Sequence, residues 1–202
     1  MKVYLILNPM YEVFFQKLNE VITLTGEEET IFRSYLLPKK LRKKQYILQE
    51  GDVCKYSIFV EKGLLRSYTV NEKGNDQIVQ FALEGWWISD MYSFITGEPA
   101  RYNIDALEDA ELVLISYTGM EELRKRIPKF LEFSFLQMRN AYIAFEKRLF
   151  GIVNLTTEER YTELMQRCPS IGQRVPQHMI ASYLGLTPET LSRARKQMAT
   201  KK

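Results

Sequence analysis

The sequence predicts an α+β fold with three consecutive parts: a β-sandwich or β-barrel, one long helix and a small helical unit. The first observation is that residues 41–117 hold short runs of β-branched and aromatic residues, separated by turn-forming residues about every ten positions. The second is an apolar heptad maintained between residues 131 and 152. The third is a pair of short helical patterns on either side of Gly185, within residues 175–198.

The composition is that of a globular protein. Of the 202 residues, 46% are hydrophobic, which is enough to bury a core, and 26% are charged, which argues against wholesale disorder. The net charge of +3 permits a nucleic-acid partner without requiring one. The positive charge is concentrated in the last ten residues, which include Arg193, Arg195, Lys196, Lys201 and Lys202.

The cysteine and histidine content argues against an enzyme and against a bound metal or other cofactor. Cys54 and Cys168 form neither a CxxC pair nor a disulfide framework, so both are expected to be buried or half-buried thiols. Because His178 is the one histidine, the sequence has no Ser/His/Asp set, Cys/His set or His-rich metal site. The apolar run that ends at Pro9 is about half the length of a membrane span, so we expect a cytoplasmic protein without a membrane partner.

The elements that precede the long helix are predicted from local periodicity. Residues 10–37 have two helical patterns with a break at Thr25-Gly26-Glu27, and Pro38 ends this region. No helical segment of about 10–15 residues separates the strands before Gly85, which argues against a parallel βαβ sheet. A hairpin is expected to turn at Asn71–Asp76, and EGWW is expected to be a turn. The expected strands are QYILQ, YSIFVEKG, LLRSYTV, QIVQFA, YNIDAL and AELVLIS.

A short helix over Gly119–Arg126 and a long helix that begins at Pro128 are expected next. Apolar residues of the long helix recur at alternating spacings of four and three, as in the seam of a coiled coil: Leu131, Phe135, Met138, Tyr142, Phe145, Leu149 and Ile152. A core helix that lies against its own domain would also produce this pattern. A second apolar face favours a parallel two-stranded coiled coil, and hence a homodimer, because that face could cover the barrel: Phe133, Leu136, Ile143 and Phe150.

A small helical unit begins at Asn154. Thr156 or Thr157 can cap a helix over Glu158–Arg167, and Pro169 ends that helix. Residues 170–175 are expected to form a polar loop or a short strand.

The stretch VPQHMIASYLGLTPETLSRARKQM, residues 175–198, has the pattern of a helix-turn-helix. Its first helix is expected to begin at Gln177. Gly185 supplies the left-handed backbone of the turn, Thr187 is a strong N-cap and Pro188 occupies the first position of the second helix. The inward-facing residues of the two helices are apolar or small: Ile180, Ala181, Leu184, Leu191, Ala194 and Met198.

The outer face of the second helix has the chemistry that the major groove of double-stranded DNA requires. Arg193 can bond guanine O6 and N7 together, and Glu189 can accept from cytosine N4. An ordinary helical hairpin with a charged solvent face is the alternative interpretation. The candidate DNA-binding residues are Gln177, His178, Thr187, Glu189, Thr190, Ser192, Arg193 and Lys196.

The segment GLTPETLSRARKQM resembles the recognition-helix segment of the CRP/FNR family of bacterial transcription regulators. Glu189, Ser192 and Arg193 match the FNR-type pattern of Glu, two residues, Ser, Arg. The EGD, EKG and EGWW turns are similar to turns of the family's barrel, a jelly roll that acts as a sensor.

The resemblance implies an organisation for nearly the whole chain. Residues 1–128 would form the cyclic-nucleotide-binding-like sensor barrel with its N-terminal helices, residues 129–153 the dimerisation helix, and residues 154–202 the helix-turn-helix domain. It also implies RNA polymerase as a partner, in addition to DNA and a second copy of the chain.

The sequence departs from the family's cyclic-nucleotide site, in which a Gly-Glu-Leu helix start and a later Arg-Ser pair hold the nucleotide. Ser89 stands at the glycine position, Asp90 replaces the longer glutamate, and Tyr102 follows Arg101 where a small hydroxyl residue is expected. Arg101 could still hold a phosphate. Because the rest of the pocket is degenerate, cAMP is not expected to bind, and the small-molecule effector is unassigned.

A second departure follows the recognition helix. Family members continue into a β-hairpin wing, whereas this sequence has ATKK after Met198, so a truncated wing is expected, with Lys201 and Lys202 as the remaining phosphate contacts. Two hypotheses follow. The favoured one is a dimeric, sequence-specific DNA-binding transcription regulator, because every position of the helix-turn-helix pattern is filled. The other is a ligand- or partner-binding sensor whose C-terminal helices do not read DNA.

Overall fold

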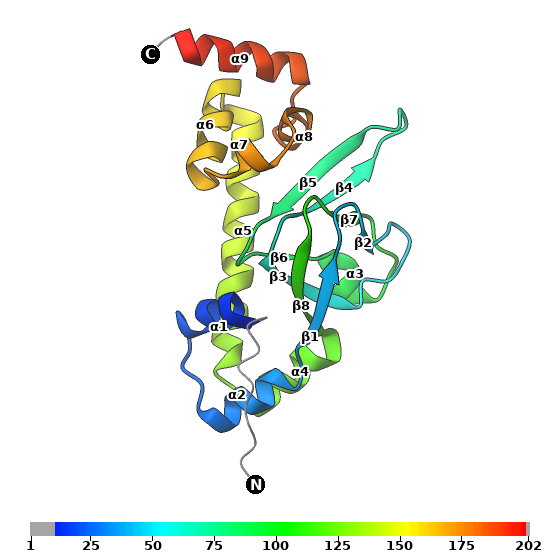
Figure 1. The fold of residues 1–202 in the computed structure, drawn as a ribbon, viewed down its shortest axis with the longest axis vertical. Coiled ribbons are helices and arrows are strands. Elements are labelled where there is room, and N and C mark those ends of the chain that lie inside the picture. The colour runs from blue at the N-terminus through cyan, green and yellow to red at the C-terminus, as the bar shows by residue number, and fades with distance from the viewer. Residues whose placement is uncertain (1–10, 201–202) are drawn as a thin grey trace. The chain divides into compact units, whose positions relative to one another are not determined.

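The computed structural model describes residues 11–200, and its elements confirm the predicted α+β class (Figure 1). The chain divides into two compact units. The first contains the described positions up to Ser67 together with Gln80–Phe135, and the second contains Tyr68–Val79 and the described positions from Leu136 onward. The apolar run that ends at Pro9 and the expected phosphate contacts of Lys201 and Lys202 lie outside the described residues.

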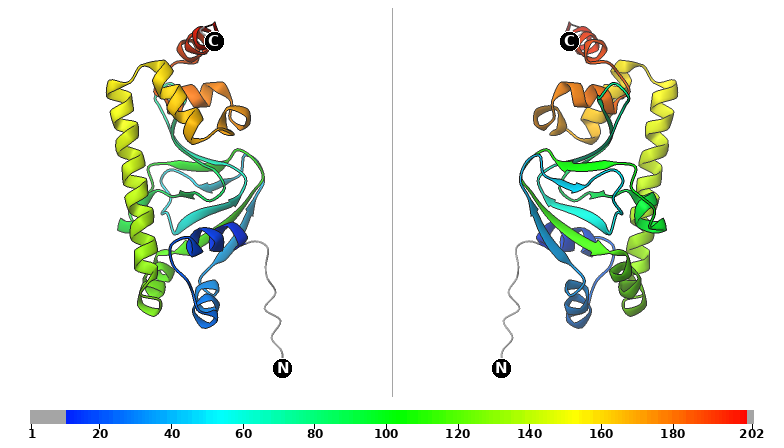
Figure 2. Two further views of the ribbon diagram at one scale, coloured as in Figure 1. Left: turned by 90° about the vertical axis from the view of Figure 1, so that its left-hand side faces the viewer. Right: turned by 90° about the vertical axis from the view of Figure 1, so that its right-hand side faces the viewer.

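The β-rich part consists of two sheets with the strand orders β1-β8-β3-β6 and β2-β7-β4-β5. The pairings of β1 with β8, β2 with β7, and β3 with both β6 and β8 are antiparallel, as predicted. Figure 2 shows the strands of both sheets from two further sides. Apolar side chains from both sheets form one buried core, to which Ile58 and Leu112 contribute from the first sheet and Leu65 and Ile104 from the second. The strands are β1 (Leu37–Leu41), β2 (Tyr46–Leu48), β3 (Tyr56–Lys62), β4 (Leu65–Val70), β5 (Asp76–Ala82), β6 (Trp87–Ile88), β7 (Asn103–Ala106) and β8 (Ala110–Ser116).

Three elements before residue 117 were not predicted from the sequence. Strand β1 begins at Leu37 and contains Pro38, which the sequence analysis took as a break. Proline is tolerated here because β1 is the outermost strand of its sheet, where a missing N–H removes no central hydrogen bond. Strand β6, which begins at the last residue of the expected EGWW turn, and helix α3 (Met91–Thr96) are too short to produce a clear periodicity.

Two N-terminal helices, α1 (Glu12–Asn19) and α2 (Gly26–Arg33), confirm the predicted helical pieces and the break between them. The break is a capping box: Thr25 accepts from the backbone N–H of Glu28, and the Glu28 carboxylate accepts from the backbone N–H of Thr25. Both helices pack on the first sheet through a second apolar core. This core contains a group of aromatic rings, namely Phe14, Phe15, Phe32, Phe59, Trp87, Phe130 and Phe133.

Strands β4 and β5 form the predicted hairpin. The backbone N–H of Asn71 donates to the carbonyl of Asn75 at 3.0 Å, and the N–H of Gly74 donates to the carbonyl of Asn71 at 2.8 Å. The Asn71 side chain also accepts from the N–H groups of Lys73 and Asn75, both at 3.0 Å. The turn is therefore fixed by its own residues.

Helices α4 (Tyr117–Arg126) and α5 (Phe130–Asn154) confirm the predicted short and long helices, although α5 begins two residues after Pro128. Every residue of the predicted seam is exposed, from 45% at Ile152 to 67% at Phe135. An exposed apolar stripe of this length on a single chain indicates a protein interface.

The second apolar face of α5 is only partly covered. Phe133 is 2% exposed and lies in the aromatic core, and Leu136 is half-buried. Ile143 and Phe150 are 41% and 59% exposed, so the prediction that they are covered by the barrel is wrong. The reason is that α5 belongs to the first unit only as far as Phe135.

The helices that follow α5 complete the second unit. Thr156 caps α6 (Thr157–Arg167) through a capping box with Glu159, as predicted. Residues 170–175 form α7 (Ile171–Arg174) rather than a loop or strand, because Ile171 and Val175 are four residues apart and are both buried. Within residues 11–200, no helix combines the length and the apolar character that a membrane span requires.

Candidate nucleic-acid interface

Two helices at the C-terminus form a helix-turn-helix with the predicted boundaries. Helix α8 spans Gln177–Tyr183 and helix α9 spans Pro188–Thr200. Their facing residues are buried, namely Ile180, Ala181, Leu184, Leu191 and Ala194, and Met198 is half-buried. Helix α9 also lies against α6, where the Arg195 guanidinium is 5.8 Å from the centre of the Tyr161 ring. The orientation of α9 is therefore set by α6 and α8 together.

The turn between the helices depends on backbone conformation at Gly185, whose φ is +70°. The N–H of Leu186 donates to the Ala181 carbonyl at 2.9 Å, and the N–H of Gly185 donates to the Ser182 carbonyl at 3.0 Å. These two bonds satisfy carbonyls at the end of α8. Thr187 then accepts from the N–H of Thr190 at 3.2 Å and begins α9.

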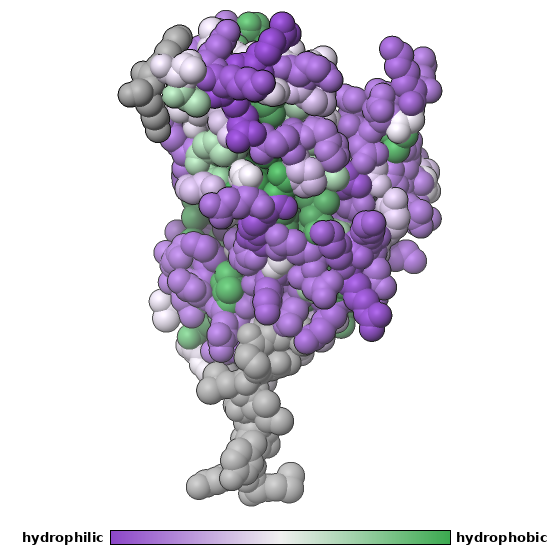
Figure 3. Space-filling model, turned by 45° about the horizontal axis from the view of Figure 1, so that its top comes forward, coloured by the Kyte–Doolittle hydropathy of each residue, from purple (hydrophilic) through white to green (hydrophobic). Residues whose placement is uncertain are grey.

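The outer face of α9 is accessible. Glu189, Ser192, Arg193 and Lys196 are exposed, and their spacings place them on neighbouring turns of one face. Thr190 is half-buried, and its hydroxyl lies 3.0 Å from that of the exposed Thr187. Hydrophilic side chains cover much of the upper surface in Figure 3, where α9 lies in Figure 1.

The other two candidate residues lie at the start of α8. His178 is exposed. Gln177 is half-buried, and its side-chain oxygen is buried without a hydrogen-bond partner. The structure thus places His178 at the surface, whereas the Gln177 side chain is only partly accessible.

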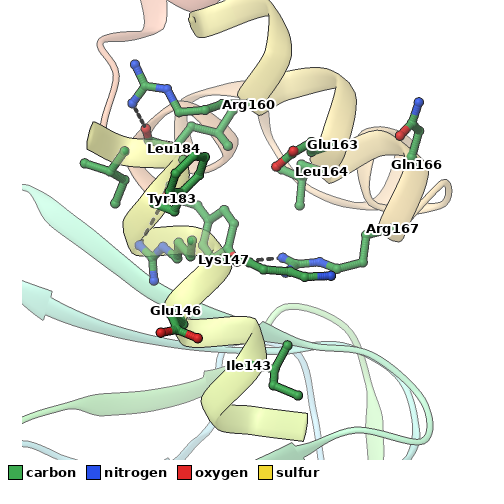
Figure 4. A pocket seen from close by; sticks show the side chains of 14 residues that line it. Ile143, Glu146, Lys147, Arg160, Glu163, Leu164, Gln166, Arg167, Tyr183 and Leu184 are labelled. Carbon is green, nitrogen blue, oxygen red and sulfur yellow. Dashed lines mark hydrogen bonds between the residues drawn. The ribbon is translucent and has the colours of Figure 1, made fainter. Parts of the chain in front are cut away.

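Three arginines hold the C-terminal end of α8 (Figure 4). Arg160 of α6 donates to the Leu184 carbonyl at 2.9 Å, and Arg148 of α5 donates to the Tyr183 carbonyl at 3.1 Å. Arg167 of α6 donates to the Tyr183 hydroxyl at 2.7 Å. Carbonyls at the end of a helix lack intrahelical donors, and positive charge is favourable there. The arginines border a cavity of about 820 Å³ between α5, α6 and α8.

The residues of the expected effector pocket have separate roles in the structure. Asp90 is fully buried, and its two carboxylate oxygens accept from the backbone N–H groups of Ser93 at 3.0 Å and Arg101 at 2.7 Å. The Ser89 hydroxyl accepts from the N–H of Ile58 at 3.3 Å. The Arg101 guanidinium lies 4.0 Å from the centre of the Tyr92 ring, on an exposed side chain.

Tyr102, the fourth residue of that set, is half-buried. A cavity of about 350 Å³ in the first unit is lined by none of the four. Its lining residues are Ile47, Leu48, Asp52, Val53, Cys54, Lys55, Tyr56 and Ile58.

The cysteines are both buried and free, which confirms their prediction as thiols of the interior. Burial raises the pKa of both the Cys54 and the Cys168 thiol, so neither has the character of an activated nucleophile. Among the residues that the structure describes, no group of three or more His, Cys, Asp and Glu side chains could hold a metal ion.

The residues that hold the helix-turn-helix in place were not predicted from the sequence. Arg148, Arg160 and Arg167 occupy two helices that precede α8, and no local pattern links them to the α8 carbonyls. Ser182 was also missed, although its hydroxyl contacts the β4–β5 hairpin. A serine between the apolar residues of a helix was the signal that the sequence offered.

Comparisons with known proteins agree with this architecture. Residues 38–126 match the family model described as "Cyclic nucleotide-binding domain". The chain is 27% identical, over 168 residues, to the fumarate and nitrate reduction regulatory protein of Vibrio cholerae, and the match covers 77% of this chain and 66% of that protein. It is 28% identical, over 185 residues, to the regulatory protein HlyX of Actinobacillus pleuropneumoniae, covering 85% and 75%.

The chain spans just under two thirds of the Vibrio relative, at 66% of its length. Among solved structures, FixK2 from Bradyrhizobium japonicum superposes with a TM-score of 0.69 and 24% identity, covering 82% of this chain and 85% of FixK2. This likeness is one of fold, and it confirms the predicted arrangement of an N-terminal barrel and a C-terminal helical domain.

Replacing Gly185 with alanine is expected to destabilise the protein by about 1–2 kcal/mol, because a left-handed backbone places Cβ close to the next carbonyl oxygen. Nothing lies within 4 Å of an added Cβ, so the cost comes from the φ of +70° alone. Gly185→Asn should cost less, because asparagine tolerates this conformation. Urea unfolding of both variants measures the difference. Equal losses would contradict a backbone origin.

Proposed function

This chain belongs to the CRP/FNR family of transcription regulators, and we propose that it is a dimeric regulator that reads specific sequences of double-stranded DNA. The observation that carries the proposal is the outer face of α9. Glu189, Ser192, Arg193 and Lys196 are exposed together on a helix whose opposite face is buried against α6 and α8. This is the geometry of a recognition helix, which presents side chains to base edges from a fixed support.

Each exposed residue has a distinct role in the proposal. Arg193 bonds guanine O6 and N7 in the major groove, and Glu189 accepts from cytosine N4. Lys196 bonds a backbone phosphate, and Ser192 bonds a phosphate or a base edge near it. Thr187 and Thr190, at the start of α9, and Gln177 and His178, at the start of α8, contact the neighbouring backbone phosphates, where helix N-termini favour negative charge.

The competing hypothesis is a sensor whose C-terminal helices only pack against each other. It explains the buried face of α9 but gives no role to the exposed Glu189, Ser192 and Arg193 set. The relatives are named as regulatory proteins, which also supports a regulator rather than an enzyme.

We further propose that the seam of α5 pairs with the same seam of a second copy. The two recognition helices then meet two half-sites of a palindromic operator. This assigns residues 129–153 to dimerisation, residues 1–128 to the sensor barrel and residues 154–202 to DNA binding. RNA polymerase is the proposed protein partner on the basis of the family.

The barrel is proposed to bind neither cAMP nor cGMP. Asp90 replaces the ribose-binding glutamate, and both of its oxygens already accept backbone N–H groups. The Arg101 guanidinium contacts the Tyr92 ring, which is not one of the other three residues of the expected pocket. The barrel therefore either binds an effector of another chemistry or has no small-molecule effector.

Arg193→Ala is expected to weaken operator binding by about 1–3 kcal/mol and to relax the preference for one guanine in each half-site. Lys196→Ala is the matched control, since loss of a phosphate contact should weaken all sequences about equally and lower the salt slope by about one. Binding selections from random DNA, followed by titrations at several salt concentrations, measure both effects. An unchanged base preference in Arg193→Ala would refute the assignment of α9.

Phe145→Glu is expected to convert the protein from a dimer into a monomer, because it places a charge in the centre of the apolar seam. Light scattering should give twice 23.8 kDa for the wild type and 23.8 kDa for the variant. Operator affinity should fall with it, because the two half-sites are no longer bound together. Asn140→Glu, on the opposite side of α5, is the control and should remain dimeric. A wild-type monomer that binds its operator fully would contradict the proposed seam.

Calorimetric titration with cAMP and cGMP is expected to reveal no binding tighter than about millimolar, or roughly −4 kcal/mol. The physical reason is that the Asp90 carboxylate is fully buried and bonds backbone N–H groups through both oxygens, so it is not presented to a ribose hydroxyl. Micromolar binding of either nucleotide would overturn this assignment, and Arg101→Ala would then test whether that residue holds the phosphate.

A further inference from the structure

Strand β5 lies at the end of its sheet, so one edge of its backbone has no neighbouring strand among residues 11–200. In a strand, the N–H and C=O groups of residues two apart point to the same side. The carbonyls of Asp76 and Ile78 and the N–H of Ile78 therefore belong to the same edge. Ile78 is 3% exposed, and buried backbone groups of this kind require partners.

The partners come from two helices of the same compact unit. The Ser182 hydroxyl on α8 donates to the Asp76 carbonyl at 2.8 Å and accepts from the Ile78 N–H at 3.0 Å. Arg148 on α5 donates to the Ile78 carbonyl at 3.2 Å and also to the Val79 carbonyl. Helix α8 thus occupies the place that another strand would take.

Arg148 connects this strand edge to the helix-turn-helix a second time. The same guanidinium donates to the Tyr183 carbonyl at 3.1 Å and lies 4.3 Å from the centre of the Tyr183 ring. One side chain of α5 therefore contacts both β5 and the end of α8. Ser182 and Arg148, with the backbone groups that they bond, are here called the hairpin junction.

We infer that Ser182 and Arg148 are positioning residues for DNA recognition, which hold α8, and through it α9, on the β4–β5 hairpin; this inference rests on the proposed function. The hairpin strands continue without interruption into the first unit, since β4 begins at Leu65 and β5 ends at Ala82. A displacement of these strands is therefore passed to α8 through the junction. Without the hairpin junction, the helix-turn-helix would have to be ordered when it binds DNA. The cost of that ordering lowers the affinity for DNA.

The direction of the Ser182 hydroxyl supports this role. A serine or threonine inside a helix usually bonds the carbonyl four residues before it. Thr162 does so on α6, where its hydroxyl donates to the Glu158 carbonyl at 2.8 Å. Ser182 instead directs both of its hydrogen bonds to β5, 104 and 106 residues away in sequence.

The test compares Ser182→Ala and Arg148→Lys with the matched control Thr162→Ala, all in the full chain. Lysine keeps the charge of Arg148 but has a single nitrogen, which cannot reach the β5 and α8 carbonyls together. Operator affinity, the dimeric state and hydrogen exchange of the Ile78 amide are measured for each. We expect operator affinity about tenfold weaker and faster Ile78 exchange in both variants, with dimers retained, and no change in Thr162→Ala.

Three results would overturn the inference. The first is faster Ile78 exchange with operator affinity unchanged or increased, which would make the junction merely structural. The second is wild-type exchange at Ile78 in Ser182→Ala, which would mean that the hydroxyl is not its partner. The third is an equal loss of affinity in Thr162→Ala. Failure of the proposed function is distinguishable, because the wild-type protein itself would then select no DNA sequence.

Discussion

The end of α8 imposes the constraint on which the helix-turn-helix depends. A seven-residue helix followed at once by a turn leaves carbonyls without intrahelical donors, and the turn itself satisfies only those of Ala181 and Ser182. Arginines from two other helices supply donors to Tyr183 and Leu184. Because α9 begins four residues after Leu184, the position of the proposed recognition helix follows from where these arginines lie.

The barrel keeps its fold although residues of the expected effector pocket have other roles. The two sheets and their buried core are present, and residues 38–126 match the cyclic nucleotide-binding domain model, yet Asp90 serves as the N-cap of α3 and accepts from the Arg101 backbone N–H. The Asp90 carboxylate is fully buried, and each of its oxygens accepts a backbone N–H group, so it supports the local backbone and is not presented to a ribose. A fold does not fix its ligand, and the ligand has to be argued from the residues.

The sequence was sufficient where structure depends on local pattern. The helix breaks at Thr25 and Gly185, the Asn71 turn and the seam of α5 each follow from residues that are close in the chain. It was insufficient where structure depends on distant contacts. Nothing near Arg148 in the sequence indicates that its guanidinium bonds Ile78 and Tyr183, which are 70 and 35 residues away. Such bonds satisfy backbone groups, which every residue has, so they leave no signature in the sequence.

Helix α5 joins the two proposed functions of the second unit. Phe145 and Leu149 belong to its exposed seam, whereas Arg148, between them in sequence, turns to β5 and α8. Adjacent positions of a helix point about 100° apart, so one rigid turn presents an apolar residue to a second copy and a cation to the helix-turn-helix. A rotation of α5 that changed the seam would also move the Arg148 donors. The proposed dimerisation and the orientation of the proposed recognition helix would therefore be coupled through a single turn of α5.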